Sequence, residues 1–291
     1  MCDYFNDYMK ITFFGTNQFA TTILQELIND PVIEIGSVIT QPDKTVGRKK
    51  VMQPSLVKQL AQKNNIPIEQ PDSLKNYQLP FSNHELNIVV DYGLIIPEKI
   101  LNTPKQGSIN IHPSLLPKYR GPSPLQSALI NGDKETGVTI ILIDKKMDHG
   151  PILAQERVQI NPNETYIELS DKTANKATQM LLKTIHKWAN DEIKPQIQDD
   201  TKATFCKILT RDSGLVDFNK TALEIYNQYR GLTPWPGIWT TIKNKRLKLI
   251  KIKLSDQKLD TGKILFTKNK FYIGCKQQSI EVLELQLEGK K

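Results

Sequence analysis

The feature that most constrains this fold is a regular alternation of short apolar segments with amphipathic segments over the first two-thirds of the chain. Apolar runs typical of strands lie at residues 10–15, 33–39, 86–90, 108–112, 137–143 and 153–160. Segments with helical spacing of apolar residues lie at 19–28, 55–63, 124–130 and 166–188. Strands that alternate with helices predict an α/β fold with a Rossmann-like, doubly wound and mainly parallel sheet. Ligands of such sheets bind at the carboxyl ends of the strands.

The pattern changes after Trp188. A polar stretch without periodicity follows, which is typical of a linker. Short strand-like runs then occur at 238–242, 246–254, 263–266, 270–273 and 279–285, and such runs indicate a small β-barrel. The sequence therefore predicts a Rossmann-like domain over residues 1–189, a linker over 190–207 and a small β-barrel domain over 208–291.

Several classes of protein are excluded by features that the sequence lacks. It has no apolar run of about 18 residues, so we expect neither a transmembrane helix nor a membrane partner. The first residues are polar and acidic, unlike a signal peptide. Cys2, Cys206 and Cys275 lie far apart, which argues against disulfides and against a zinc site. We therefore expect a cytoplasmic protein without a metal.

Positive charge is concentrated in the last third of the chain. The formal net charge is +8, and residues 191–291 carry 19 lysines and arginines against 12 acidic residues. An acidic polymer bound mainly by one domain would explain this distribution. A solvated, lysine-rich surface explains it equally well on charge alone.

Gly15 stands where a Rossmann protein has its phosphate-binding turn. Dinucleotide binding would require G-x-G-x-x-G, but residues 15–20 read Gly-Thr-Asn-Gln-Phe-Ala. No second glycine lets the backbone approach a pyrophosphate. We therefore expect no NAD or related cofactor, despite the predicted fold.

Two polar residues, Asn110 and His112, share one face of the strand at 108–112, because side chains two apart in a strand point the same way. Pro113 ends that strand and leaves both groups at its carboxyl end. An amide donor beside an imidazole suits acyl transfer, in which the amide stabilises an oxyanion and the imidazole moves protons. Spacing alone leaves open the alternative that the two residues merely cap a strand end.

A loop that contains Asp144 and Asp148 follows the strand predicted at 137–143. We expect Asp148 to reach the same edge of the sheet as His112, where a carboxylate would favour the imidazolium and orient the ring. Asp144 is an alternative for that role, and either acid taken alone fits an ordinary turn. His149 is an alternative base, although its place beside Gly-Pro is more typical of a solvated loop.

The segment 108–121 contains Asn-x-His-Pro-Ser-Leu-Leu-Pro-x-Tyr-Arg-Gly and resembles the signature of the folate-dependent formyltransferases. This resemblance implies that Asn110, His112 and Asp148 form the catalytic set. It also implies a folate site, with the expected residues Ser114, Leu115, Leu116, Pro117, Tyr92, Gly93 and Leu94. The implied formyl donor is 10-formyltetrahydrofolate.

Further segments, over nearly the whole chain, resemble the branch of this family that formylates methionyl-tRNA. Residues 40–50 are similar to a basic loop that contacts the tRNA acceptor end in that branch. Residues 194–199 are similar to its linker, and residues 234–236 (Pro-Trp-Pro) to its C-terminal domain, which resembles an OB-type barrel. The sequence departs from the family pattern at Asn17, where proline is usual, and at Asp91, where alanine is usual.

The predicted strand 246–254 points to RNA without any family knowledge, because cationic and aliphatic residues alternate along it. One slip, at Leu249 and Ile250, indicates a β-bulge. The apolar residues would face a core and the cations the phosphates of a folded RNA. A charged edge strand that resists aggregation is the alternative. The expected tRNA-binding residues are Arg48, Lys49, Lys50, Lys207, Arg246, Lys248, Lys251 and Lys253.

The resemblance thus implies an enzyme that formylates the α-amino group of methionine on initiator methionyl-tRNA, and we expect a monomer. A sugar-nucleotide formyltransferase, a glycinamide ribonucleotide formyltransferase or a formyltetrahydrofolate hydrolase could use the same three residues. None of these requires a basic loop and a basic second domain. A nicotinamide dehydrogenase would need the missing glycines, and a pure RNA-binding protein would leave the Asn-His-Asp set unexplained.

Overall fold

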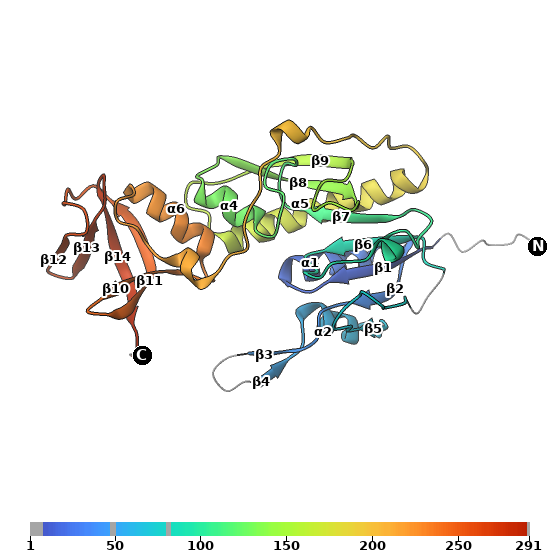
Figure 1. Ribbon diagram of the computed structural model, residues 1–291, viewed down its shortest axis with the longest axis horizontal. Coiled ribbons are helices and arrows are strands. Elements are labelled where there is room, and N and C mark those ends of the chain that lie inside the picture. The colour runs from blue at the N-terminus through green and yellow to red at the C-terminus, as the bar shows by residue number, and fades with distance from the viewer. Residues whose placement is uncertain (1–7, 47–50, 80–82, 290–291) are drawn as a thin grey trace, which may run out of the picture. The chain divides into compact units, whose positions relative to one another are not determined.

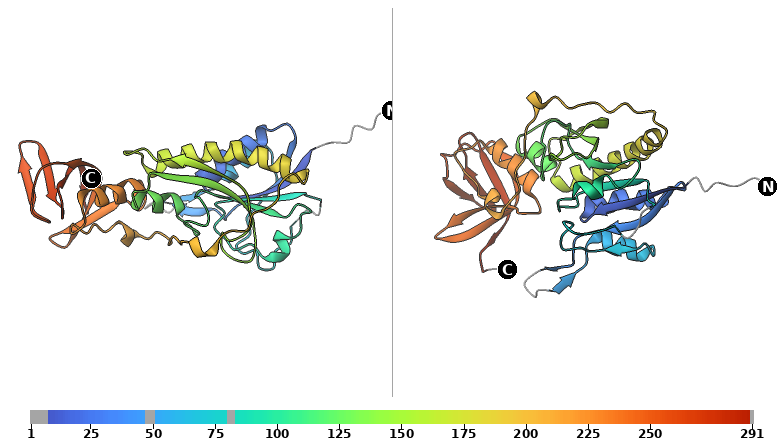
Figure 2. Two further views of the ribbon diagram at one scale, coloured as in Figure 1. Left: turned by 90° about the horizontal axis from the view of Figure 1, so that it is seen from above. Right: turned by 45° about the vertical axis from the view of Figure 1, so that its right-hand side comes forward.

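The computed structural model describes residues 8–46, 51–79 and 83–289, and the chain forms two compact units. The first unit contains residues up to Arg120 together with 137–158 and 171–205. The second contains 121–136, 159–170 and 206–291. Figures 1 and 2 show the path of the chain through each unit.

A seven-stranded sheet forms the centre of the first unit, with the strand order β5-β2-β1-β6-β7-β8-β9 (Figure 1). Its strands are β1 (Met9–Gly15), β2 (Ile33–Ile39), β5 (Ile68–Glu69), β6 (Leu86–Val90), β7 (Ser108–His112), β8 (Glu135–Leu142) and β9 (Ile152–Gln159). The pairs that join β5, β2, β1, β6 and β7 are all parallel, which confirms the predicted mainly parallel sheet. β8 is an exception, because it pairs antiparallel with β7.

Each face of this sheet has its own apolar core. On one face, α1 (Gln18–Asn29), α2 (Leu56–Lys63) and α5 (Tyr166–Ala189) pack against sheet residues that include Phe13. On the other face, α3 (Glu98–Leu101) and the segment around Leu74 pack against Phe14. Successive side chains of a strand point to opposite faces, so both phenylalanines of β1 are buried and the strand reads as a continuous apolar run. A separate hairpin pairs β3 (Lys44–Val46) with β4 (Val51–Gln53).

The second unit contains a five-stranded antiparallel sheet with the order β10-β11-β14-β13-β12. Its strands are β10 (Ile238–Ile242), β11 (Lys245–Ser255), β12 (Ile264–Thr267), β13 (Lys270–Gly274) and β14 (Ser279–Leu287). The five short strands predicted for this part of the chain are therefore confirmed. In the part of the chain that the structure describes, β10 and β12 are the edges of the sheet.

Two helices, α4 (Pro124–Ile130) and α6 (Ala222–Leu232), pack together in the second unit. α6 begins with a capping box, in which Thr221 and Glu224 satisfy each other's backbone N–H groups. Gly231 permits the close approach, because a Cβ there would lie 2.8 Å from Ile130 Cγ1. This packing places residues 121–136 in the second unit, whereas the predicted first domain is the continuous range 1–189. The predicted domain boundaries stay a prediction.

Two short 3-10 helices, Asp200–Lys202 and Arg211–Gly214, complete the secondary structure.

None of the described helices is both long enough and apolar enough to cross a bilayer.

Candidate active site

Asn110 and His112 lie two residues apart on β7, the strand that the sequence predicted at residues 108–112. Asn110 is half-buried, and His112 is buried with 4% of its surface exposed. His112 Nε2 donates a hydrogen bond to the main-chain oxygen of Tyr119 at 2.9 Å. That bond fixes the ring orientation and leaves Nδ1 as the nitrogen that faces the site.

Asp148 joins these two residues from the loop that follows β8. Its Oδ1 accepts a hydrogen bond from Asn110 Nδ2 at 3.3 Å and lies 3.6 Å from His112 Nδ1. The Asp148 side chain is only 14% exposed. An amide, an imidazole and a carboxylate therefore meet in one partly buried cluster, which we call the Asn110–His112–Asp148 cluster.

The loop reaches this cluster by a route that the sequence did not predict. Because β8 runs antiparallel to β7, the loop begins beside the amino end of β7, where the Ile143 N–H donates to Ser108 O at 2.8 Å. It then folds back along β7 to bring Asp148 to Asn110 and His112. The loop thus brings Asp148 to the edge of the sheet where His112 lies, as we expected, and the antiparallel direction of β8 adds only the path by which it does so.

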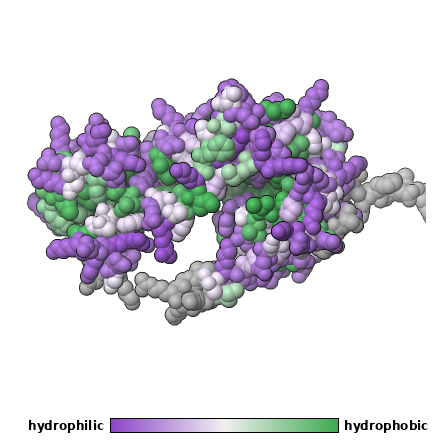
Figure 3. Space-filling view, viewed as in Figure 1, coloured by the Kyte–Doolittle hydropathy of each residue, from purple (hydrophilic) through white to green (hydrophobic). Residues whose placement is uncertain are grey.

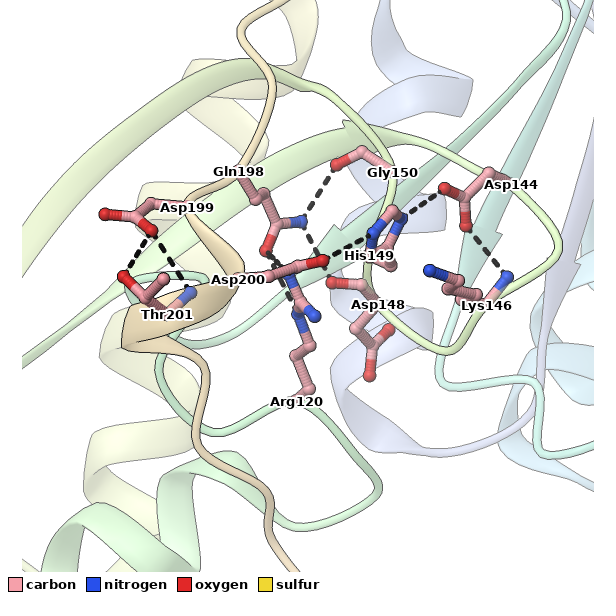
Figure 4. A network of polar contacts seen from close by, with 10 residues as sticks. All are labelled: Arg120, Asp144, Lys146, Asp148, His149, Gly150, Gln198, Asp199, Asp200 and Thr201. Atoms are coloured by element: carbon pink, nitrogen blue, oxygen red, sulfur yellow. Dashed lines mark hydrogen bonds and ion pairs between the residues drawn. The ribbon is translucent and has the colours of Figure 1, made fainter.

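Asp144, the alternative acid, has different partners. Its Oδ2 lies 2.6 Å from His149 Nδ1, and its Oδ1 accepts from the Lys146 N–H at 2.9 Å. His149 Nε2 in turn lies 3.2 Å from Asp200 Oδ2 (Figure 4). His149 is thus a bridging residue between two acids rather than a freely solvated loop residue.

The segment Ser114–Pro117 is held tightly against β8. Ser114 is fully buried, and its hydroxyl donates to Lys118 O at 2.6 Å. Thr139 Oγ1 donates to Ser114 O and accepts from the Leu116 N–H. Leu116 is 3% exposed, so the surface that this segment offers to a ligand comes mainly from Leu115 and Pro117.

The loop after β6 contains the other residues expected to bind folate. Tyr92 is buried with its ring edge-on to Phe14, and burial raises the pKa of Tyr92 to about 12. Its main-chain oxygen accepts from Thr16 Oγ1 and from Gln41 Nε2. Gly93 has a φ of +81° and is exposed, whereas Leu94 is half-buried. This φ favours glycine, and a Cβ on Gly93 would also displace the end of the Gln41 side chain.

The residues expected to bind tRNA are only partly described. Arg48, Lys49 and Lys50 lie outside the described residues. Lys207 is exposed in the second unit. On β11, Lys248, Lys251 and Lys253 are exposed, and Arg246 is half-buried with its guanidinium 4.1 Å from the ring centre of Trp239.

β11 lies between β10 and β14, but β10 pairs only with Lys245–Leu249, so the alternative of a charged edge strand is excluded for that half of β11 alone. The register shifts around Lys251, which confirms the predicted bulge. Ile250 and Leu254 are 39% and 42% exposed, so these two do not face the core as we expected. Hydrophobic side chains are interspersed among hydrophilic ones on the face of the second unit seen at the left of Figure 3.

Two buried polar residues beside the loop after β8 were not predicted from the sequence. Arg120 and Gln198 are 4% and 7% exposed and hydrogen-bond to each other (Figure 4). Gln198 lies in the polar segment that we interpreted as a linker. That segment has no periodic pattern of apolar residues from which a buried position could be predicted. Among the described residues, no group of three or more histidines, cysteines and acids is placed to bind a metal.

Comparison with known families gives matches over both units. Residues 9–185 match the family described as Formyl transferase, and residues 208–291 match Formyl transferase, C-terminal domain. A methionyl-tRNA formyltransferase of Caldicellulosiruptor saccharolyticus is 40% identical over 291 residues, which cover 97% of this chain and 93% of that protein. One from Staphylococcus epidermidis is 40% identical over 289 residues, with the same shares covered.

Solved structures share the fold at lower identity. A sugar 3N-formyl transferase, crystallised with dTDP and 5-N-formyl-THF, has a TM-score of 0.70 and 24% identity, covering 97% of this chain and 99% of that one. An N-formyltransferase from Helicobacter canadensis, in complex with folinic acid and dTDP-3-aminofucose, has a TM-score of 0.70 and 21% identity. It covers 96% of this chain and 100% of that one.

Proposed function

Because this chain belongs to the formyl transferase family, we propose that it moves the formyl group of 10-formyltetrahydrofolate to the α-amino group of methionine on initiator methionyl-tRNA. The observation that carries the proposal is 40% identity, over 97% of the chain, to relatives named for formylation of methionyl-tRNA. The basic composition of the second unit agrees with a polyanionic substrate. A monomeric state stays a prediction.

The reaction requires a neutral amine, an oxyanion site and two proton transfers. The amine nitrogen attacks the formyl carbon, and the carbonyl electron pair moves onto oxygen to give a tetrahedral centre. That centre collapses when the bond from carbon to N10 breaks. One proton leaves the attacking nitrogen and one reaches N10, so the products are tetrahydrofolate and the formylated amine.

Asn110 is suited to the oxyanion. One N–H of its side-chain amide donates to Asp148, and the other forms no hydrogen bond within the described residues. A positioned donor of this kind strengthens its bond as negative charge develops on the formyl oxygen. His112 in its protonated form would supply a second donor through Nδ1, since Nε2 is already bonded to Tyr119 O.

Asp148 supports both residues in this scheme. Its carboxylate oxygen lies 3.6 Å from His112 Nδ1 and accepts a hydrogen bond from Asn110 Nδ2, so it orients both side chains. It also accepts the proton that the attacking amine must lose, either directly or through water. Leu115, Pro117 and the main chain at Gly93, which are all at least partly exposed, would contact the folate.

The test is a comparison of acceptors. The purified protein is incubated with 10-formyltetrahydrofolate and, in separate reactions, with initiator methionyl-tRNA, elongator methionyl-tRNA and a dTDP-aminosugar. We expect formylated methionyl-tRNA from the initiator species. Formylation of the aminosugar with no transfer to tRNA would overturn the proposed substrate, and release of formate alone would indicate a hydrolase.

A further inference from the structure

We propose that Gln198, from the segment after α5, is a positioning residue for formyl transfer that acts through the main chain of the Asp148 loop. The inference rests on the proposed role of Asp148 as a catalytic residue. Gln198 is 7% exposed, and its amide bonds to the main chain at Asp148 and Gly150, the two residues that flank His149 (Figure 4).

The amide of Gln198 uses every hydrogen bond available to it. Nε2 donates to Asp148 O at 2.9 Å and to Gly150 O at 2.8 Å. Oε1 accepts from Arg120 Nε at 3.2 Å and from Arg120 Nη2 at 2.8 Å. A flipped amide would set its donors against the guanidinium and its oxygen against two carbonyl oxygens, so only one orientation is compatible with these neighbours.

The loop needs such a constraint because its conformation is unfavourable at Asp148. The φ of Asp148 is +50°, in the left-handed region that side chains other than glycine rarely adopt. Gly150 is fixed on the other side, since a Cβ there would overlap Leu142 O. The two bonds from Gln198 therefore hold both sides of His149 and set the direction in which the Asp148 carboxylate leaves the main chain.

Gln198 is itself fixed by charged neighbours. Arg120 Nη2 pairs with Asp200 Oδ1 at 2.7 Å, and Asp200 Oδ2 lies 3.2 Å from His149 Nε2. The chain just before Gln198 pairs with the start of β9, through two hydrogen bonds between Ile152 and Gln196. Gln198 therefore approaches the loop from a firmly held segment.

The decisive variant is Gln198→Glu, which keeps size and shape. A glutamate still accepts from Arg120 but offers no N–H to the two carbonyl oxygens, so the loop loses both bonds. A displacement of the catalytic carboxylate by about 1 Å lowers turnover about 100-fold. We expect kcat to fall about 10- to 100-fold, with KM for folate and for tRNA changed less than about threefold. Gln198→Met, which is neutral and of similar length, should have the same effect.

Gln228 provides a matched control in the second unit. It is 8% exposed, and its Nε2 donates to two main-chain oxygens two residues apart, Ser213 O at 2.9 Å and Leu215 O at 3.1 Å. Gln228→Met removes bonds of the same kind from a segment outside the proposed catalytic site. Methionine is the right replacement, because Gln228 Oε1 has no hydrogen-bond partner among the described residues and a glutamate there would bury an unpaired charge. We expect Gln228→Met and Gln198→Met both to lower Tm, but only Gln198→Met to lower kcat.

A double-mutant cycle separates positioning from general damage. If Gln198 acts through Asp148, then Gln198→Glu should lower kcat less than about twofold in the Asp148→Asn background. Independent losses that multiply would overturn the inference. So would wild-type kcat in both folded Gln198 variants, or a loss of kcat from Gln228→Met as large as that from Gln198→Met. If instead Asp148→Asn alone keeps wild-type kcat, the proposed role of Asp148 fails, which is a separate result.

Discussion

Asn17 Nδ2 donates a hydrogen bond to Asp91 Oδ2 at 2.9 Å, although the two residues are 74 positions apart. These are the two positions at which the sequence departs from the pattern of the family that it resembles. The adjacent Thr16 Oγ1 donates to Tyr92 O at 3.1 Å, so two hydrogen bonds join the turn after β1 to the loop after β6. The two departures are therefore one structural feature, a side-chain pair at the edge of the expected folate site.

Loss of this pair should weaken folate binding without affecting tRNA. Asp91 has a φ of +46°, so Asp91→Gly removes the side chain without straining the backbone. One hydrogen bond contributes about 1 kcal/mol, so we expect KM for folate to rise about fivefold. Asp91→Asn keeps an acceptor for Asn17 and should change KM less than about twofold. Steady-state kinetics with each substrate varied measures both, and equal effects of the two variants would point to charge rather than the hydrogen bond.

Asn110→Ala and His112→Ala should each lower kcat about 100-fold or more, because each removes a group from the proposed oxyanion site. Single-turnover formylation of methionyl-tRNA measures the loss, and circular dichroism shows whether the fold is kept. Near-normal turnover in both folded variants would disprove the catalytic assignment.

The two acids of the loop after β8 should differ sharply in their effect. Asp148→Asn keeps the shape of the side chain but removes the carboxylate that would accept the proton of the attacking amine, so kcat should fall. Asp144→Asn loosens its pair with His149 and should act mainly on stability. A fall of kcat in Asp144→Asn but not in Asp148→Asn would reverse the assignment.

The exposed lysines of β11 should make tRNA binding depend on salt. Each neutralised phosphate adds roughly 0.7 to 0.9 to the slope of log K against log salt, so replacing Lys248 and Lys251 with Gln should flatten it by up to about 1.8. Lys253 is a weaker choice, because its Nζ lies 3.3 Å from Glu281 Oε2. The control replaces Lys183 and Lys187 of α5, which are also exposed, and should leave the slope unchanged. A slope that is equal in both double variants would mean that the row on β11 does not contact tRNA.

Asp200 should contribute stability that disappears in acid. The hydrogen bond from Arg120, and after it the one from His149, hold the pKa of Asp200 below its ordinary value of 3.8. A carboxyl whose pKa is lower in the folded state stabilises the fold above the unfolded value, and this contribution is lost as pH falls through the folded value. Urea unfolding should therefore separate wild type from Asp200→Asn near about pH 6, and the difference should shrink below about pH 4. A difference that grows in acid would contradict this assignment.

The local pattern of the sequence was enough to predict most elements of both units, although it missed the short elements β3, β4, β5 and α3. Periodicity of apolar residues is a local property, so the strand 108–112 and the helix 124–130 were predicted with the bounds that the structure has. The shared face of Asn110 and His112 follows from the same geometry. Their catalytic role, together with that of Asp148, came from the resemblance to a family and stays a prediction.

Only the tertiary structure shows how segments far apart in the sequence pair and contact one another. The direction of β8 depends on how its neighbours pair, and no residue within it encodes that direction. The place of β11 inside its sheet is likewise set by its partners. Gln198 is the clearest example of a position whose burial could not be predicted from the sequence. Its polar surroundings in the chain predict exposure, yet it is buried, because Arg120 and two main-chain oxygens, all far from it in sequence, satisfy its amide. A buried polar group is stable only with such partners, and partners brought together by folding leave no periodic signal in the sequence.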